Sequence, residues 1–304
     1  MKIPSVSFFI PSYNCASTVR ESVQSIIETN FLEGDEIIMT NDCSTDNTSE
    51  ILESLTSEYT FIKVFQNNRN RGGAATRNIC IENAKHDLLF CLDSDNILAD
   101  NSLMPLRKHQ ISTKADVVSF QEMRFFSQSK DIYDYTWKFN ESTTLADMLA
   151  DNRNPASSGN YLFTKESWIK AGGYPEFSKA LDTWGFGFYQ LATGSKMVAL
   201  PDSHYLHRHG TESYYIRDMN SRNMAIAMLQ IILPYLDKIH PDDIEYIFSK
   251  EGRYIWIDKL LERPIRTSEN IPGKQIIQTT YDRKPNKINI IKRILRKIDR
   301  MIPN

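Results

Sequence analysis

The sequence contains few cysteines, and they do not form the patterns that bind zinc or build a disulfide framework. Four occur among 304 residues, widely separated and without a Cys-x-x-Cys pair: Cys15, Cys43, Cys80 and Cys91. This usage is typical of a protein from a reducing cytoplasm. An excess of charge is lacking as well, because 36 Lys and Arg residues face 38 Asp and Glu residues, a net charge of −2. The balance gives no reason to expect a nucleic-acid partner.

Long hydrophobic runs are also missing. Residues 6–10 are mostly apolar but too few for the core of a signal peptide, and Pro11 ends the run. The most apolar later stretch, residues 225–236, is short and interrupted by Gln230 and Pro234. No segment approaches the roughly 20 residues that span a bilayer. We therefore expect a cytoplasmic protein without a transmembrane helix.

The first hundred residues alternate between strand and helix patterns. Short apolar runs predict four strands, at residues 6–10, 36–40, 61–65 and 88–92. Helical spacing of apolar residues predicts three helices between them, the first opened by a capping box at residues 18–21, the second around residues 51–55 and the third over residues 72–84. This order is typical of βαβ units and a mostly parallel sheet. In such sheets ligands bind beyond the carboxyl ends of the strands.

The pattern changes after residue 100. We predict strands at residues 117–121 and 197–200, an irregular aromatic stretch at 123–140, and helix from about 216 to 262. The predicted fold is α/β, a mostly parallel mixed sheet flanked by helices with a C-terminal helical segment. The predicted organisation is a domain at 1–215 with halves 1–100 and 101–215, a helical extension at 216–264, a linker at 265–286 and a basic amphipathic helix at 287–304.

Polar and glycine-rich motifs follow the predicted strands. They are Pro11-Ser12-Tyr13-Asn14, Thr40-Asn41-Asp42-Cys43-Ser44-Thr45-Asp46, Gly72-Gly73-Ala74-Ala75-Thr76-Arg77-Asn78 and Asp93-Ser94-Asp95. Their order and spacing resemble glycosyltransferase family 2, the nucleotide-sugar transferases with a GT-A fold. The resemblance covers roughly residues 4–215, about 70% of the chain.

Asp93 and Asp95 are the predicted metal ligands. Residues i and i+2 of an extended chain point the same way, so the two carboxylates would repel one another unless a hard cation such as Mg²⁺ or Mn²⁺ lay between them. The resemblance implies that Asp95 contacts the metal and that Asp93 holds the ribose or the metal. Some family relatives add a late histidine, for which His207 is slightly preferred to His209. The alternative for either histidine is an ordinary surface hydrogen bond.

Eight residues form the predicted nucleotide-sugar site. A carboxylate at Asp42 suits a pyrimidine N–H, Pro11 and Tyr13 would lie under the base, and the amides at the start of a helix favour an anion. The full set is Pro11, Tyr13, Asn41, Asp42, Gly73, Arg77, Asp93 and Ser94. The alternatives are that Asp42 and Asp46 cap the next helix, that Tyr13 is a core residue, and that Arg77 is an exposed partner of an acid.

Asp182 is the predicted general base, with Glu176 as the fallback. In family 2 this acid commonly lies in an acidic pair after a Gly-Gly-Tyr segment, which here is Gly172-Gly173-Tyr174, and Thr183 stands where the second acid is expected. Direct displacement at an anomeric carbon needs such a carboxylate to take the proton of the acceptor hydroxyl. Ser158, Asn160 and Trp184 are the predicted acceptor residues, although buried packing explains them equally well.

The tail carries one apolar stripe and many positive charges. Ile291, Ile294, Leu295, Ile298 and Ile302 fall on one helical face, while six basic residues and one acid between 287 and 300 give a net charge of +5. Helices of this kind bind anionic membrane surfaces. We predict peripheral attachment through residues 287–302 to the inner face of a membrane. The alternative is a helix docked on its own domain or on a partner.

Together these features predict an inverting glycosyltransferase of hexosyltransferase type, active in polysaccharide biosynthesis. The donor would be a nucleoside-diphosphate sugar, UDP-linked, used with Mn²⁺ or Mg²⁺, and the acceptor a glycan or a lipid-linked hydroxyl. A sugar-phosphate nucleotidyltransferase would need a glycine-rich basic loop after the first strand, and a nicotinamide dehydrogenase would need Gly-x-Gly-x-x-Gly there. Neither is present. A non-catalytic nucleotide-sugar-binding protein of the same fold stays open because of Thr183.

Overall fold

The computed structural model describes residues 3–150, 153–210 and 222–247. The chain divides into two compact units, Met1–His240 and Pro241–Asn304. Of the second unit the described part contains one helix, α11 (Pro241–Ile247).

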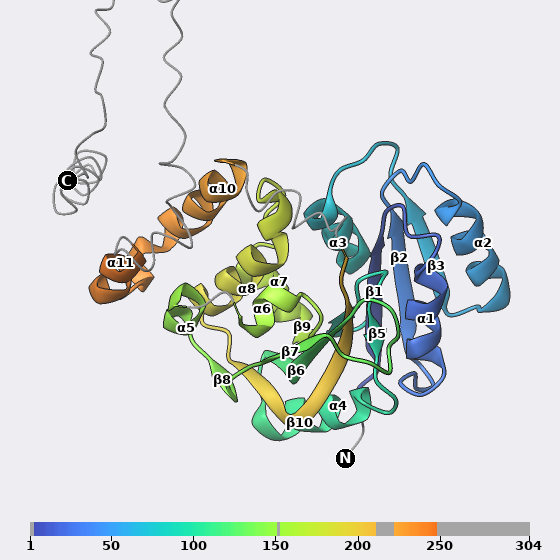
Figure 1. Ribbon diagram of the computed structural model, residues 1–304, viewed down its shortest axis with the longest axis horizontal. Helices are drawn as coiled ribbons and strands as arrows, with labels where there is room; N and C mark the ends of the chain where they lie inside the picture. Colours follow the sequence, from blue (N-terminus) through green and yellow to red (C-terminus); the bar gives the residue numbers. More distant parts are fainter. Residues whose placement is uncertain (1–2, 151–152, 211–221, 248–304) are drawn as a thin grey trace, which may run out of the picture. The chain divides into compact units, whose positions relative to one another are not determined.

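One mixed sheet runs through the first unit in the order β3-β2-β1-β4-β9-β6-β10-β5, with β7 paired to β6 and β8 to β10 (Figure 1). The strands are β1 (Val6–Ser12), β2 (Glu36–Asn41), β3 (Ile62–Gln66), β4 (Leu88–Cys91), β5 (Ile97–Leu98), β6 (Val117–Phe126), β7 (Tyr135–Lys138), β8 (Ser142–Thr143), β9 (Leu162–Thr164) and β10 (Met197–Arg208). β3, β2, β1 and β4 are parallel neighbours, β9 is antiparallel to both β4 and β6, and β10 is parallel to β6. The predicted α/β class and mostly parallel mixed sheet are confirmed.

Helices flank this sheet. They are α1 (Val19–Ile27), α2 (Thr48–Glu58), α3 (Gly73–Glu82), α4 (Leu103–Thr113), α5 (Leu145–Ala150), α6 (Pro155–Ser158), α7 (Lys165–Ala171), α8 (Asp182–Ala192) and α10 (Arg222–Ile232), with 3-10 turns η1 (Lys179–Leu181) and η2 (Leu233–Lys238). α3 packs on β1 and β2, and α8 lies among α6, α7 and α10 (Figure 1). α3 therefore stands between the nucleotide half of the domain and the half that carries α8.

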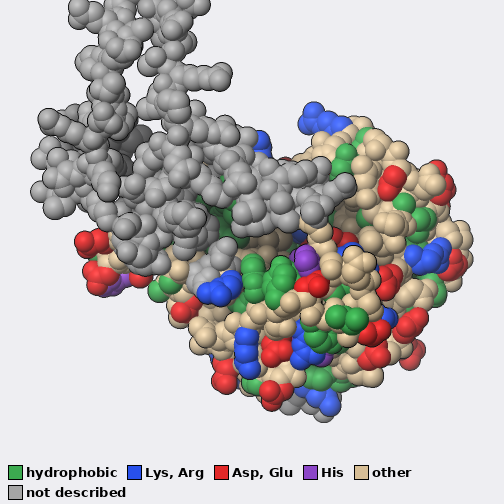
Figure 2. Space-filling view, viewed as in Figure 1, with side chains coloured by type: hydrophobic (Ala, Val, Ile, Leu, Met, Phe, Trp, Pro, Cys, Tyr) green, Lys and Arg blue, Asp and Glu red, His purple; other side chains and the backbone are tan. Residues whose placement is uncertain are grey.

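The central strands are buried on both faces, as is usual for parallel strands. All six residues of β2 are buried, as are the first five of β1, because helices cover both faces of the sheet. Phe8, Ile10 and Met39 join the apolar face of α1 in one core cluster. On the surface, positive and negative side chains are interspersed in Figure 2, in line with the near-zero net charge.

One local prediction was wrong and two were incomplete. Thr18 makes no side-chain bond to its own helix, because its hydroxyl donates to the carbonyl of Ser94 at 2.9 Å. Residues 123–140 are only partly irregular, since β6 continues to Phe126 and β7 returns after a loop at 127–134. The strand predicted at 197–200 extends to Arg208, past a register irregularity between Leu200 and His204.

The C-terminal predictions meet the structure only in part. α10 buries Ala227, Met228 and Ile231, and the first compact unit extends to His240, so residues 222–240 pack with the domain rather than in a separate extension. The predicted linker at 265–286 and basic helix at 287–304 lie outside the described residues. Among the described helices, none has the length and apolar content needed to cross a membrane.

Candidate active site

The motif segments meet at the carboxyl edge of the parallel strands. Ser12 at the end of β1 is in register with Asn41 at the end of β2, and the amide of Asp42 donates to the carbonyl of Ser12 at 2.8 Å. β4 ends at Cys91 beside β1, so Asp93 emerges at the same edge. The structure thus brings the predicted donor residues together, as the strand order requires.

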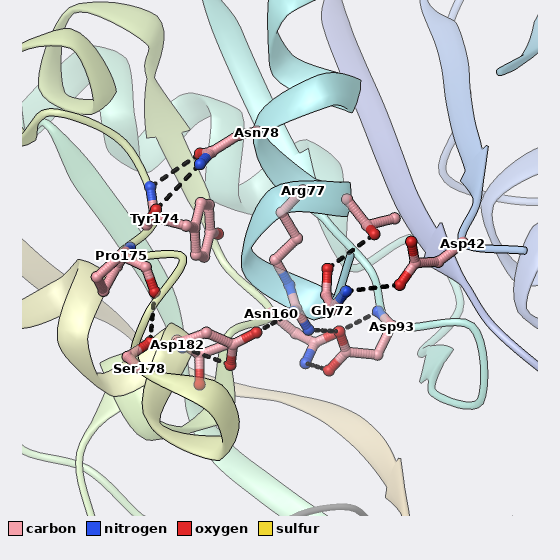
Figure 3. Close-up of polar contacts among 12 residues, drawn as sticks. Asp42, Gly72, Arg77, Asn78, Asp93, Asn160, Tyr174, Pro175, Ser178 and Asp182 are labelled. Carbon is pink, nitrogen blue, oxygen red and sulfur yellow. Dashed lines mark hydrogen bonds and ion pairs between the residues drawn. The ribbon is translucent and has the colours of Figure 1, made fainter. Parts of the chain in front are cut away.

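Asp42 is a buried acceptor of three hydrogen bonds. One carboxylate oxygen accepts from the Asn67 side-chain amide at 2.7 Å and the Arg71 amide at 2.8 Å. The other accepts from the Gly72 amide at 2.8 Å (Figure 3). The carboxylate therefore shapes the loop that leads into α3. It does not cap α2, whereas Asp46 accepts from the Thr48 amide at 3.1 Å, as the capping alternative required.

The other residues predicted to bind the nucleotide base differ in their exposure and in their hydrogen bonds. Asn41 is fully buried, and its side chain is held by Ser44 and Ser49. Tyr13 is 47% exposed, so it is not a core residue, and Pro11 beside it is half-buried. Tyr13 is thus free to contact a ligand, while Asn41 acts on the turn after β2.

A buried ion-pair cluster joins the two halves of the domain. Arg77 of α3 donates through Nη2 to Asp93 at 2.6 Å and through Nη1 to Asp182 at 2.7 Å (Figure 3). Asn160, between α6 and β9, accepts from the Asp93 amide at 2.8 Å and donates to its carboxylate at 2.9 Å. Arg77 is 8% exposed, so it is not the exposed arginine of the alternative. It holds one acid from the donor side and one from the start of α8.

The cluster contains one arginine and two aspartates, and burial and charge shift the pKa values of its members. Burial raises the pKa of Asp182, and the neighbouring Arg77 only partly counteracts this effect. Burial alone would lower the pKa of Arg77, but the adjacent carboxylates of Asp182 and Asp93 raise it well above its ordinary value. One permanent cation therefore serves two acids, and Asp182 has a stronger affinity for a proton than an ordinary aspartate.

The residues predicted to hold a cation differ in their surroundings. Asp95 has a solvent-accessible face, yet the surrounding protein and then the Asp93 carboxylate raise its pKa to about 7. Burial lowers the pKa of His207 to about 4, and its Nδ1 has no hydrogen-bond partner in the described structure. His209 differs, because its Nε2 contacts Asp134 at 2.7 Å. Crowded carboxylates and a neutral imidazole fit a divalent cation chemically.

These side chains do not form a closed protein cage. Among the described residues, no group of three or more His, Cys, Asp and Glu side chains is placed to hold a metal. Two carboxylates at a strand end suit an ion such as Mg²⁺, which usually keeps waters and takes further oxygens from substrate phosphates. The donor set therefore fits a cation that arrives with a diphosphate.

The predicted acceptor residues are buried, as the packing alternative required. Ser158 is 4% exposed, and its hydroxyl donates to the Pro155 carbonyl at 2.7 Å. Asn160 is fully buried against Asp93, and Trp184 is 3% exposed with its ring stacked on Phe188. Ser158 and Asn160 support the Asp93 side of the site, and Trp184 packs within the helical layer.

The fallback base, Glu176, lies in a different environment from Asp182. It is exposed, 3.4 Å from the Arg71 guanidinium and 3.5 Å from the Asn78 amide. Asn78 was missed by sequence reasoning. It bonds both backbone groups of Tyr174, at 2.8 and 3.0 Å, and so fixes the turn before α8 to α3 (Figure 3). The feature of the sequence that could have identified Asn78 is its position directly after Arg77.

Comparisons with known proteins agree with this arrangement. The family described as Glycosyl transferase family 2 matches residues 7–170, more than half of the chain. The chain belongs to glycosyl transferase family 2. The match covers the nucleotide half with its Asp93-Ser94-Asp95 motif and ends at α7, before Asp182.

The chain spans less than half the length of the curated relatives described here. An uncharacterized glycosyltransferase of Haemophilus influenzae is 32% identical over 103 residues, which cover 34% of this chain and 41% of that protein. A hyaluronan synthase of Pasteurella multocida is 24% identical over 302 residues, 95% of this chain and 30% of that one. The aligned region thus spans less than half of either relative.

Solved structures share the fold. Residues 1–349 of TarS from S. aureus, in complex with UDP, match with a TM-score of 0.59 at 19% identity, covering 86% of this chain and 76% of that one. The mannosyltransferase PcManGT from Pyrobaculum calidifontis, in complex with GDP-Man and Mn²⁺, matches with a TM-score of 0.58 at 16% identity, covering 83% and 70%. At these identities the likeness concerns the fold alone.

Proposed function

We propose that this family 2 protein is an inverting glycosyltransferase that moves a hexosyl group from a UDP-sugar to a hydroxyl of a glycan or lipid-linked acceptor. The observation that carries the proposal is the Arg77 cluster. It places a buried carboxylate, Asp182, one arginine away from Asp93 at the edge of the sheet where donors bind. A transferase needs both a diphosphate site and a base within reach of the same anomeric carbon.

Asp182 is the proposed general base. Its raised pKa suits proton removal better than that of a solvated aspartate, because an effective base binds its proton more strongly. As the acceptor oxygen bonds to the anomeric carbon, its proton passes to the Asp182 carboxylate, and the bond from that carbon to the diphosphate breaks. Glu176 is less suited because it is exposed and pairs with Arg71.

The donor side is assigned by the residues already described. Asp42 holds the loop before α3, Tyr13 offers an exposed ring for the base, and α3 begins at Gly73, where helix amides attract phosphate. A Mg²⁺ or Mn²⁺ ion held by Asp93 and Asp95 would neutralise the charge on the departing diphosphate. The complexes of TarS with UDP and of PcManGT with Mn²⁺ support the choice of a nucleotide donor and a divalent cation.

The acceptor and the location are proposed from a relative and from the sequence of the tail. The hyaluronan synthase relative favours a polysaccharide product, and the basic segment at 287–302 favours the inner face of an anionic membrane. The rival function is a binding protein without catalysis, since Thr183 replaces the second acid of the usual pair. The nucleotidyltransferase alternative has no support, because Tyr13-Asn14 directly after β1 does not begin a glycine-rich basic loop.

A donor screen separates these possibilities. The purified chain is incubated with Mn²⁺ and a panel of UDP-, GDP- and dTDP-sugars, and nucleoside diphosphate release is measured with and without glycan acceptors. A transferase releases UDP from at least one sugar faster when acceptor is present, and its product has the inverted anomeric configuration. A protein that binds a UDP-sugar with metal and never releases UDP is the scaffold, and a retained configuration excludes single displacement.

A further inference from the structure

The beginning of α3 makes unusually close contact with the proposed base. A Cβ atom built on Gly73 would lie 2.6 Å from the Asp182 carboxylate and 2.7 Å from Nη1 of Arg77. Ordinary contacts of a Cβ begin at about 3.4 Å, so no side chain fits at Gly73 while these two groups keep their positions. The backbone at Gly73 is helical, and an alanine is compatible with its conformation.

We propose that Gly73 and Arg77 are positioning residues for the general base. The missing side chain at Gly73 admits the Asp182 carboxylate to the start of α3, and one guanidinium nitrogen of Arg77 then fixes its orientation. The other nitrogen of Arg77 fixes Asp93, so the acid of the acceptor side keeps a constant position relative to the donor side. This inference rests on the proposed function and adds the residues that place its base.

The burial of the cluster argues for positioning rather than for stability. The side chains of Arg77, Asp93 and Asp182 are 10%, 22% and 12% exposed, so their charges have lost most of their water. Removing charges from water costs about as much as a buried pair regains, and apolar replacements are often as stable. A fork of two charge-assisted bonds does, however, set distances and angles closely.

Asn78 supports the same arrangement from the next position of α3. Its side chain bonds both backbone groups of Tyr174 and accepts from the indole of Trp168 at 3.1 Å. The turn before α8 is thereby fixed to α3, and Gly173 in that turn has a φ of +82°, which favours glycine. Asp182 thus approaches Gly73 from a segment that is already held in place.

The decisive variant is Gly73→Ala, because it retains every ionisable group. To reach 3.4 Å, the Asp182 carboxylate must move by about 0.8 Å. Displacements of roughly 1 Å cost about 100-fold in rate when a catalytic group is misplaced. We expect transfer kcat to fall by about 10- to 100-fold, while the melting temperature and the Kd for UDP stay close to wild type. The matched control is Gly210→Ala, since a Cβ at Gly210 meets nothing within 4 Å.

A double-mutant cycle tests whether the effect passes through Asp182. If Gly73→Ala acts by displacing the base, it slows the wild type but causes no further loss in an Asp182→Asn background. Equal losses in both backgrounds would mean that Gly73 acts elsewhere and would overturn the inference. Arg77→Lys provides a second route should Gly73→Ala fold poorly. A lysine keeps the charge but has no fork to reach both acids, so kcat should fall even at saturating donor and metal.

The outcomes also separate this inference from the proposed function. If the wild type transfers sugar and Asp182→Asn does not, but Gly73→Ala and Arg77→Lys both transfer at the wild-type rate, the positioning inference fails and the proposed function stands. If Asp182→Asn transfers normally, the base assignment and the positioning inference fail together. If the wild type releases no nucleotide from any donor, the proposed function itself fails, and the inference with it.

Discussion

Replacing Asp42 by asparagine should weaken both the fold and nucleotide binding. The buried carboxylate accepts three hydrogen bonds, from the Asn67 side chain and from the amides of Arg71 and Gly72. Asparagine has one acceptor oxygen, which keeps the bonds to Asn67 and Arg71. Its NH₂ group then faces the Gly72 amide, so a donor meets a donor where a charged acceptor stood.

The size of the effect follows from that one lost bond. A hydrogen bond to a charged group contributes about 1.5–3 kcal/mol, and an unpaired buried donor costs a similar amount. For a domain of this size, the melting temperature should fall by about 3–12 °C. Because the Asp42 loop leads into α3, the Kd for UDP should rise by about 10-fold or more, which corresponds to 1.4 kcal/mol.

Thermal unfolding and UDP titration measure both effects. The matched control is Asp100→Asn, the same chemical change at an exposed carboxylate whose one bond, to Thr29, is 3.5 Å long. It should change stability by less than about 0.5 kcal/mol. If Asp42→Asn unfolds and binds UDP like Asp100→Asn, the carboxylate does not organise the loop, and the proposed role is refuted.

Three further predictions concern the metal, the base and the tail. A chelator should abolish sugar transfer, and Mn²⁺ or Mg²⁺ should restore it. Asp95→Asn should lose at least about 100-fold in rate. Full activity of the chelated protein or of Asp95→Asn would exclude the proposed role of the metal. The rate should fall as the pH drops through the raised pKa of Asp182, because only the deprotonated form accepts a proton, so the acid limb should lie above the ordinary value of 3.8; a pH profile locates that limb. Co-sedimentation with anionic vesicles should weaken with salt and should need residues 287–302, and equal sedimentation of a chain ending near residue 285 would refute the anchor.

Periodicity was enough to predict the nucleotide half of the fold. Strands buried on both faces appear in a sequence as short apolar runs, so the sequence predicted β1 to β4 and their parallel direction. β9 has three residues, too few for a pattern, and its antiparallel position between β4 and β6 depends on partners far along the chain. The β6–β7 hairpin was missed because polar and aromatic residues are mixed in its sequence, and this mixture was interpreted as an irregular segment.

In the candidate site, too, local motifs could be predicted from the sequence, whereas contacts between distant residues could not. The strand-end motifs identified Asp42, Asp93 and Arg77 because consecutive parallel strands end at one edge. The contact between Arg77 and Asp182 joins residues 105 positions apart, and no local pattern predicts it. The buried pair of Arg107 and Asp35, 72 positions apart, was missed for the same physical reason. Long-range ion pairs depend on how the layers pack.

The transfer rate of Asp182→Asn tests the central claim most directly. The variant keeps the shape of the side chain and an oxygen for Arg77, and it loses the negative charge and the ability to take a proton. With donor, metal and acceptor present, the account predicts a fall in transfer of about 10²- to 10⁴-fold, while UDP binds as in wild type and Glu176→Gln stays active. Wild-type transfer by Asp182→Asn, together with an inactive Glu176→Gln, would contradict the account and move the base to Glu176.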